Sequence, residues 1–294
     1  MGWSEVKIGS LCTGYGGLDI AVEAFFDAEM VWCAEIDKQA SQLITTRFDK
    51  PNLGDIKQIN WDTVEPIDIL TAGYPCQPFS HAGHRKGLED ERHIWPYITK
   101  AISTLRPRIV VLENVRGHLS LGFKEVLKDL TENGYDARWQ VVRASDVGAP
   151  HQRARLFIIA YPTSIGQPSR ITCRCETTLT SATNDGCTAN TNCNSRTQSR
   201  RAISSVYIEG EGLQDGQDQR KTGYEYRFSL QMDRQTIPST LDQDRLNVKF
   251  VEYMMGLNPG WVTDLPFSRA QQLKMLGNGV VPQQAYHALE LLCQ

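Results

Sequence analysis

The sequence predicts an α/β fold built on a mostly parallel sheet, followed by a small loop-rich lobe. Short apolar runs alternate with stretches of helical periodicity between Val6 and Ala160, a pattern typical of parallel strands joined by helices. Past Pro162 the composition changes to Ser, Thr, Asn and Gly, and apolar periodicity is scarce until Leu246. A chain of 294 residues is long enough for one large core and a smaller one.

The expected elements follow one another in regular order. We expect strands at 6–12, 30–36, 67–72, 109–112, 137–142 and 156–160, and helices at 18–26, 38–48, 94–105, 123–133 and 283–293. The fourth helix should end at Gly134, because glycine readily adopts the left-handed conformation found at helix C-termini. The apolar residues at 250–255 and the final amphipathic helix indicate that the chain returns to pack on the α/β domain.

Composition narrows the function classes. The net charge of −3 provides no general attraction to nucleic acid, so a surface that binds a polyanion must be local. No run approaches the roughly 18 apolar residues of a membrane span, and the first ten residues lack the layout of a secretory signal. We therefore expect a cytoplasmic protein, of a bacterial cell or a phage-infected host, whose eight cysteines are reduced thiols.

A glycine turn opens the first expected helix. The run Thr13-Gly14-Tyr15-Gly16-Gly17 directly follows the first strand, where glycines let the backbone approach a ligand closely. Glu35 stands at the end of the second strand, from which a carboxylate can hold the hydroxyls of a ribose, and Asp55 follows the next segment. These positions indicate a cofactor that contains adenosine.

Two other interpretations of the glycine turn stay open. Any strand-turn-helix junction can carry glycine, and Glu35 with Asp37 can be a strand end and a helix cap. A nicotinamide cofactor is the other alternative, but Asp19 stands where that fingerprint requires its third glycine.

A cysteine, a carboxyl group and two arginines follow or precede other strands. Cys76 lies between two prolines after the third strand, and Glu113 follows the fourth. Arg153 and Arg155 precede the last strand, so they reach the same edge if that strand is antiparallel to the others. Taken singly, such residues are usually a buried thiol, a surface carboxylate and solvated cations.

Together these motifs resemble those of the DNA cytosine-5 methyltransferase family. In order, they are the glycine turn at 13–17, Glu35 with Asp37, Asp55, Pro75-Cys76-Gln77, Glu113-Asn114-Val115, Arg153 with Arg155, and Gly277-Asn278-Gly279-Val280-Val281-Pro282. The resemblance covers nearly all of the chain outside 163–245. It implies a Rossmann-like methyltransferase domain at 1–161 that uses S-adenosylmethionine, a small target-recognition domain at 162–265, and a segment at 266–294 that returns to the catalytic domain.

The resemblance also implies a role for each catalytic position. Cys76 would attack carbon 6 of a cytosine that has been rotated out of the duplex, which makes carbon 5 nucleophilic enough to take the methyl group. Glu113 would contact N3 and the exocyclic amine, Arg155 would stabilise charge at O2, and Arg153 would assist nearby.

Cofactor and DNA contacts are expected at further positions. The cofactor set is Cys12, Thr13, Gly14, Gly16, Gly17, Glu35, Ile36, Asp55, Ile56, Gly73, Pro75, Trp95, Asn278 and Val280. The DNA set is Gln77, Ser80, Arg85 and Lys86, in or near a loop expected to close over DNA, with Arg196, Arg200 and Arg201 in the recognition region. We expect no metal site, because Cys173, Cys175, Cys187 and Cys193 lack the usual paired ligand spacing.

The chain departs from the family pattern at two positions. His151 stands where the family often has Gln, which puts loop geometry in doubt rather than the chemistry. Cys12 stands where the family commonly has Phe against the adenine, so cofactor affinity is the property at risk.

Two alternatives to a DNA methyltransferase remain. Relatives with the same catalytic motifs modify transfer RNA, but the long insert favours DNA. An inactive DNA-binding relative is the other alternative, and intact Cys76, Glu113 and Arg155 argue against it. The expected partner is double-stranded DNA, and a cognate restriction endonuclease, as a separate protein, is a candidate second partner. We expect the protein to be a monomer that does not associate with a membrane.

Overall fold

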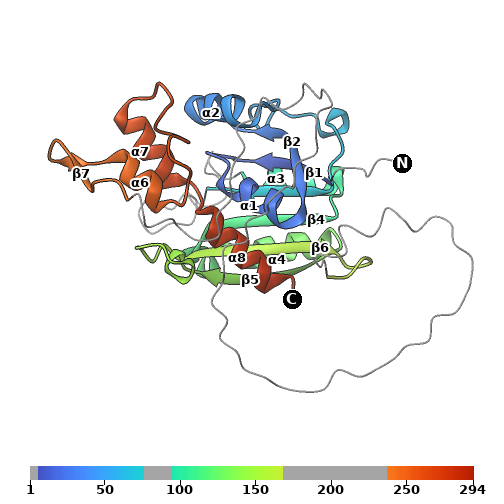
Figure 1. Cartoon of the computed structure of the whole chain (residues 1–294). Coiled ribbons are helices and arrows are strands. Elements are labelled where there is room, and N and C mark those ends of the chain that lie inside the picture. The colour runs from blue at the N-terminus through green and yellow to red at the C-terminus, as the bar shows by residue number, and fades with distance from the viewer. Residues whose placement is uncertain (1–5, 76–93, 168–236) are drawn as a thin grey trace, which may run out of the picture.

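A six-stranded sheet forms the centre of the molecule in the computed structural model, which describes residues 6–75, 94–167 and 237–294 (Figure 1). Its strands are β1 (Val6–Leu11), β2 (Ala28–Ala34), β3 (Ile69–Gly73), β4 (Ile109–Val115), β5 (Tyr135–Val142) and β6 (Arg155–Pro162). They lie in the order β2-β1-β3-β4-β6-β5, and β6 is antiparallel to both of its neighbours. The mostly parallel α/β sheet with one antiparallel strand is therefore confirmed.

Helices cover both faces of this sheet. The described helices are α1 (Gly17–Phe26), α2 (Lys38–Phe48), α3 (Trp95–Leu105), α4 (Phe123–Glu132), α6 (Val248–Met254), α7 (Arg269–Asn278) and α8 (Pro282–Leu292), of which α1, α3, α4 and α8 cover the faces. One buried cluster joins α3 and α4 to side chains of the strands, and a second joins α1 and α8 to the alternate strand positions. This alternation follows from the two-residue repeat of a strand, which sends neighbouring side chains to opposite faces.

Local sequence explains where several helices begin and end. The Asp37 carboxylate accepts hydrogen bonds from the backbone N–H groups of Gln39 and Ala40, which caps α2. The helix α4 ends at Glu132, and Gly134 has a φ of 78°, the left-handed conformation expected there. The short hairpin of β7 (Leu241–Asp242) and β8 (Arg245–Leu246) precedes α6.

A third buried cluster joins the C-terminal part of the chain to the glycine turn. It contains Tyr15 from the turn, Trp261 and Val262 from the loop after α6, and Leu276 and Val281 from either end of the α7–α8 link. Figure 1 shows α6, α7 and the hairpin together beside one end of the sheet, while α8 runs back over its face. The expected boundary between the domain at 162–265 and the segment at 266–294 falls within this cluster, which has residues on both sides of it. The expected domain limits therefore stay a prediction. Among the described residues, no helix is long and apolar enough to cross a membrane.

A buried carboxylate organises the loop that carries Trp261. Glu252 accepts hydrogen bonds from the backbone N–H groups of Gly260, Val262 and Thr263, and from the Thr263 hydroxyl, at 2.6–2.9 Å. We predict that Glu252→Ala lowers the free energy of unfolding by about 3 kcal/mol or more, because several buried donors lose their acceptor.

Urea denaturation of the two proteins measures this loss. The control is Glu132→Ala, since Glu132 is exposed and its ion pair with Lys128, at 3.6 Å, is exposed as well. Its effect should stay within about 0.5 kcal/mol. Equal stability of the Glu252 and Glu132 variants contradicts the assignment.

Candidate active site

The carboxyl ends of β3 and β4 and the start of β6 meet at one edge of the sheet. Gly73 is paired with Glu113 in the register of β3 and β4, and Arg155 begins β6 opposite Val115. A Cβ added at Gly73 would lie 3.7 Å from Oε2 of Glu113 and 3.8 Å from the carbonyl oxygen of Cys12. The carboxyl group therefore lies next to the beginning of the glycine turn, and the expected convergence of Glu113 and Arg155 is observed.

Glu113 and Arg155 form a buried ion pair. Nε of Arg155 lies 3.0 Å from Oε1 of Glu113, and their side chains are only 17% and 9% exposed, respectively. Burial raises the pKa of Glu113 to about 7, against the opposing effects of Arg155 and Arg153. A carboxyl group with this pKa can carry a proton near neutral pH and give it to a bound base.

Arg153 is directed at a different part of the chain. Its Nη2 donates hydrogen bonds to the carbonyl oxygens of Gly277 at 2.6 Å and Gly279 at 2.8 Å. Its φ is 31°, and its own carbonyl oxygen accepts a hydrogen bond from Gln284. Its Nε is buried without a hydrogen-bond partner among the described residues. Arg153 thus holds the end of α7 and the link to α8 at residues 279–281, called the α7–α8 link below. Direct assistance of Arg153 to the reaction stays a prediction.

The glycine turn is held by Glu35. Its Oε2 accepts a hydrogen bond from the backbone N–H of Gly14 at 2.9 Å, and its Oε1 accepts one from Asp37 at 2.8 Å. Gly14 and Gly16 have φ of 59° and 82°, so the turn uses the left-handed conformation that glycine allows. A Cβ added at Gly14 would meet nothing within 4 Å.

Asn52 was not predicted as a site residue, yet it fixes Glu35. Its Oδ1 accepts from the backbone N–H of Glu35 and its Nδ2 donates to the Glu35 carbonyl oxygen, both at 2.9 Å. Nδ2 also donates to Ser41. The side-chain amide therefore makes the two hydrogen bonds with the Glu35 backbone that a neighbouring strand would otherwise make. The sequence gives little indication of this role of Asn52. The one available signal is its place shortly before Gly54 and Asp55.

The chain just before Cys76 is held by Tyr74 and His118, which were not predicted as site residues, and by Asn114 of the Glu113-Asn114-Val115 motif. The hydroxyl of Tyr74 is hydrogen-bonded to Nε2 of His118 at 2.9 Å, and the carbonyl oxygen of Tyr74 accepts from Asn114 at 3.2 Å. Burial lowers the pKa of His118 to about 4, which keeps the ring neutral at physiological pH. These contacts fix the path of the chain one residue before Pro75.

Other predicted cofactor residues differ in their exposure. Ile36 is 73% exposed beside Glu35, whereas Ile56 is buried in the cluster of α3 and α4. Trp95 is also buried, and its Nε1 donates to Asp129 at 2.8 Å. Asp55 accepts from the backbone of Lys57. A contact between Trp95 and a cofactor stays a prediction.

The described residues also include part of the C-terminal motif and the two positions, His151 and Cys12, that depart from the family pattern. Asn278 is the exposed last residue of α7, and Val280 is buried next to the glycine turn. His151 contacts the carbonyl oxygen of Met254 at 2.9 Å, which ties its loop to α6. Cys12 has a φ of 54°, and burial raises the pKa of its thiol to about 12.

Several predicted residues lie outside the described parts of the chain. These are Cys76, Gln77, Ser80, Arg85, Lys86, Arg196, Arg200 and Arg201. The last described residue before the first of them is Pro75, two residues beyond Gly73. In the ranges that the structure covers, no three His, Cys, Asp or Glu side chains are grouped as metal ligands would be.

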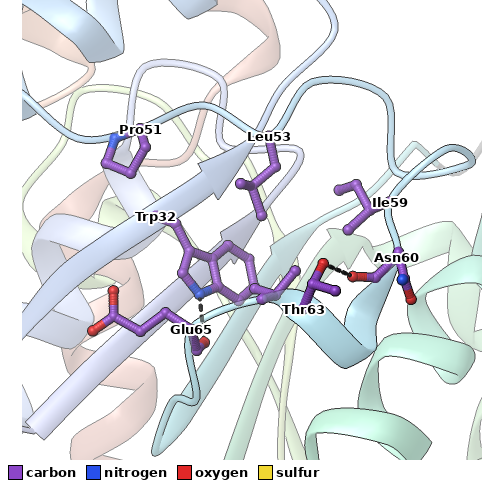
Figure 2. Close-up of a pocket in the computed structure, with 8 residues that line it drawn as sticks. Trp32, Pro51, Leu53, Ile59, Asn60, Thr63 and Glu65 are labelled. Carbon is purple, nitrogen blue, oxygen red and sulfur yellow. Dashed lines mark hydrogen bonds between the residues drawn. The ribbon is translucent and has the colours of Figure 1, made fainter.

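A depression of about 270 Å³ lies beside Trp32 (Figure 2). Its lining is Trp32, Pro51, Leu53, Ile59, Asn60, Thr63, Val64 and Glu65, none of which is a predicted site residue. Nε1 of Trp32 donates to the carbonyl oxygen of Glu65 at 2.9 Å. Pro51 and Leu53 flank Asn52, so the segment that fixes Glu35 forms part of the lining of the depression.

Comparison with known proteins adds a family context. A family model described as C-5 cytosine-specific DNA methylase matches residues 6–293. The type II methyltransferase M.Bsp6I of Bacillus sp. (strain RFL6) is 36% identical over 164 residues, which are 53% of this chain and 52% of the relative. M.HhaI of Haemophilus parahaemolyticus is 36% identical over 156 residues, 51% of this chain and 47% of the relative. The chain thus spans about half the length of these curated relatives.

Solved structures share the fold. A mutant of Spodoptera frugiperda DNMT2 superposes with a TM-score of 0.61 at 16% identity, covering 99% of this chain and 100% of that one. A putative DNA modification methyltransferase encoded within an E. coli prophage gives a TM-score of 0.59 at 18% identity, covering 98% and 99%. At such identities the likeness concerns the fold alone, and it confirms the expected Rossmann-like arrangement.

Proposed function

We propose that this chain, which belongs to the C-5 cytosine-specific DNA methylase family, transfers a methyl group from S-adenosylmethionine to carbon 5 of cytosine in double-stranded DNA. The observation that carries this proposal is the buried Glu113–Arg155 pair beside the end of β3. Cys76 follows Gly73 by three residues, and Gly73 is paired with Glu113. The proposal thus assigns a nucleophile, a proton donor and a cation to one base.

The reaction begins with addition of the Cys76 thiolate to carbon 6 of a cytosine outside the duplex. As the sulfur–carbon bond forms, the ring electrons move toward N3 and O2, where Glu113 gives its proton to N3 and Arg155 stabilises the charge at O2. S-adenosylmethionine would supply the methyl group and leave as S-adenosylhomocysteine. As carbon 5 takes the methyl group, the double bond between carbon 4 and N3 re-forms and N3 returns its proton to Glu113. Loss of the carbon 5 proton to a base restores the ring double bond and expels the Cys76 thiolate.

The residues around the glycine turn fit an adenosine cofactor. The Glu35 carboxylate accepts two backbone hydrogen bonds and retains lone pairs for ribose hydroxyls. Space is open beside Gly14, and the exposed apolar side chain of Ile36 lies next to Glu35, where it can cover a base. The second carboxylate, Asp37, is already bonded to Lys274 at 2.8 Å. We therefore assign the ribose to Glu35.

This assignment predicts that Glu35→Gln raises the dissociation constant for S-adenosylmethionine about tenfold, because charge-assisted hydrogen bonds are worth more than neutral ones. Glutamine has one oxygen, so either Gly14 or Asp37 also loses its acceptor. Isothermal titration measures the change. The matched control is Asp37→Asn, which keeps an oxygen for the α2 cap and should bind the cofactor about as tightly as the wild type. Equal affinities of the two variants contradict the assignment to Glu35.

The substrate is tested with labelled S-adenosylmethionine and either duplex DNA or transfer RNA. Incorporation into DNA alone is expected, and incorporation into RNA alone overturns the substrate assignment. Methylation-sensitive sequencing of DNA from a host that expresses the chain then identifies the recognition sequence. We assign recognition to residues 162–265. The relatives' description as type II methyltransferases supports a restriction endonuclease as a separate partner.

A further inference from the structure

Tyr15 lies within the glycine turn and is completely buried. Its hydroxyl donates a hydrogen bond to the carbonyl oxygen of Val280 at 2.6 Å, which joins positions 265 residues apart. A Cβ added at Gly279 would overlap the Tyr15 ring, and one added at Gly17 would overlap the Val280 carbonyl oxygen. Two glycines thus allow the turn and the α7–α8 link to meet at the phenol.

The α7–α8 link is held from both sides. Tyr15 binds it from the glycine turn, and Arg153 binds it from the catalytic edge through Gly277 and Gly279. The backbone of Tyr15 is held as well, because its carbonyl oxygen accepts a hydrogen bond from Nε1 of Trp261 at 3.0 Å. Tyr15 is therefore anchored through both its side chain and its main chain.

This anchor lies where the backbone is least constrained. Gly14 and Gly16 flank Tyr15, and glycine loses more conformational freedom on folding than any other residue. A fixed residue between two glycines limits the conformations of the turn before the ligand arrives, which lowers the entropic cost of binding. The backbone N–H of Gly14 then stays directed at Glu35.

We propose that Tyr15 is a positioning residue for the cofactor: its hydroxyl bond to Val280 fixes the α7–α8 link against the glycine turn and so holds the turn in its binding conformation. The proposal rests on the proposed function, since it takes S-adenosylmethionine as the ligand of the turn. Tyr15 acts through Gly14 and Glu35 and does not itself contact the reacting atoms.

The chain offers a matched control for this proposal. Tyr135 is also buried, and its hydroxyl donates to the carbonyl oxygen of Pro107 at 2.7 Å. Pro107 precedes β4 and Tyr135 begins β5, so this hydrogen bond lies at the opposite end of β4 from Glu113. Tyr15→Phe and Tyr135→Phe therefore remove equivalent hydrogen bonds, near the site and away from it.

The experiment measures the dissociation constant for S-adenosylmethionine by isothermal titration, with kcat, KM and the melting temperature, for the full chain and both variants. Tyr15→Phe should raise the dissociation constant and KM about three- to tenfold, the value of one hydrogen bond, with kcat nearly unchanged. Tyr135→Phe should lower the melting temperature about as much as Tyr15→Phe does. It should leave the dissociation constant and KM unchanged. Equal cofactor affinity in the two variants overturns the proposal.

A further variant decides the question if Tyr15→Phe does not fold. Trp261→Phe removes the donor to the Tyr15 carbonyl oxygen and keeps the phenol. A raised dissociation constant in this variant supports the proposal, and an unchanged one overturns it. Failure of the wild type to bind S-adenosylmethionine would instead refute the proposed function, so the two failures are distinguishable.

Discussion

Cys76→Ser will abolish methyl transfer while leaving the affinity for S-adenosylmethionine close to that of the wild type. A serine hydroxyl is a much weaker nucleophile than a thiolate, so the covalent step should slow by at least about a thousandfold. Neither Cys12 nor Cys33 can take its place, because burial raises the pKa of both thiols to about 12 and keeps them protonated at neutral pH.

Single-turnover incorporation of labelled methyl groups into duplex DNA measures this effect, and titration measures cofactor binding. The control is Cys293→Ser, at the end of α8, which should methylate at the wild-type rate. A duplex with 5-fluorocytosine at the target gives an independent result, since fluorine cannot leave as the proton does and the adduct accumulates. Wild type should form that covalent complex and Cys76→Ser should not; unchanged turnover of the serine variant removes Cys76 from the mechanism.

Much of the fold follows from local pattern in the sequence. The helix expected at 38–48 has those bounds, and the other expected strands and helices of the sheet domain end within about three residues of their predicted limits. The strand expected at 30–36 runs from Ala28 to Ala34 instead, because the backbone of Glu35 is bound by the side chain of Asn52 and not by a neighbouring strand. The helix α7 was not expected, since only Met275 and Leu276 in it are buried and its sequence has little apolar periodicity.

The candidate site was predictable as far as it depends on strand ends. Glu113 and Arg155 meet because each lies at a strand terminus, and sheet pairing brings those termini together. The contacts of Tyr15 with Val280 and of Arg153 with Gly279 join positions 265 and 126 residues apart. Such contacts depend on how α7 and α8 pack on the finished domain, and no local pattern encodes them.

Glu113→Gln will lower kcat by about a hundred- to ten-thousandfold, the range expected for loss of a general acid. Glutamine can still accept the hydrogen bond from Nε of Arg155, so the pair's geometry is retained while the proton for N3 is lost. Burial raises the pKa of Glu113 to about 7, so the wild-type enzyme should lose activity as the pH rises above that value. The glutamine variant should lack this alkaline decline, because it has no proton to release.

The matched control for Glu113 is Glu23→Gln. Burial also raises the pKa of Glu23 to about 7, but this carboxyl group lies on α1 and accepts a hydrogen bond from the backbone of Met30. Its replacement should leave the alkaline decline in place, because the proton that limits the reaction belongs to Glu113. The pH profiles of the three proteins are measured at saturating cofactor and DNA. A decline that persists in Glu113→Gln, or disappears in Glu23→Gln, would assign the proton to another group and leave Glu113 with an electrostatic role alone.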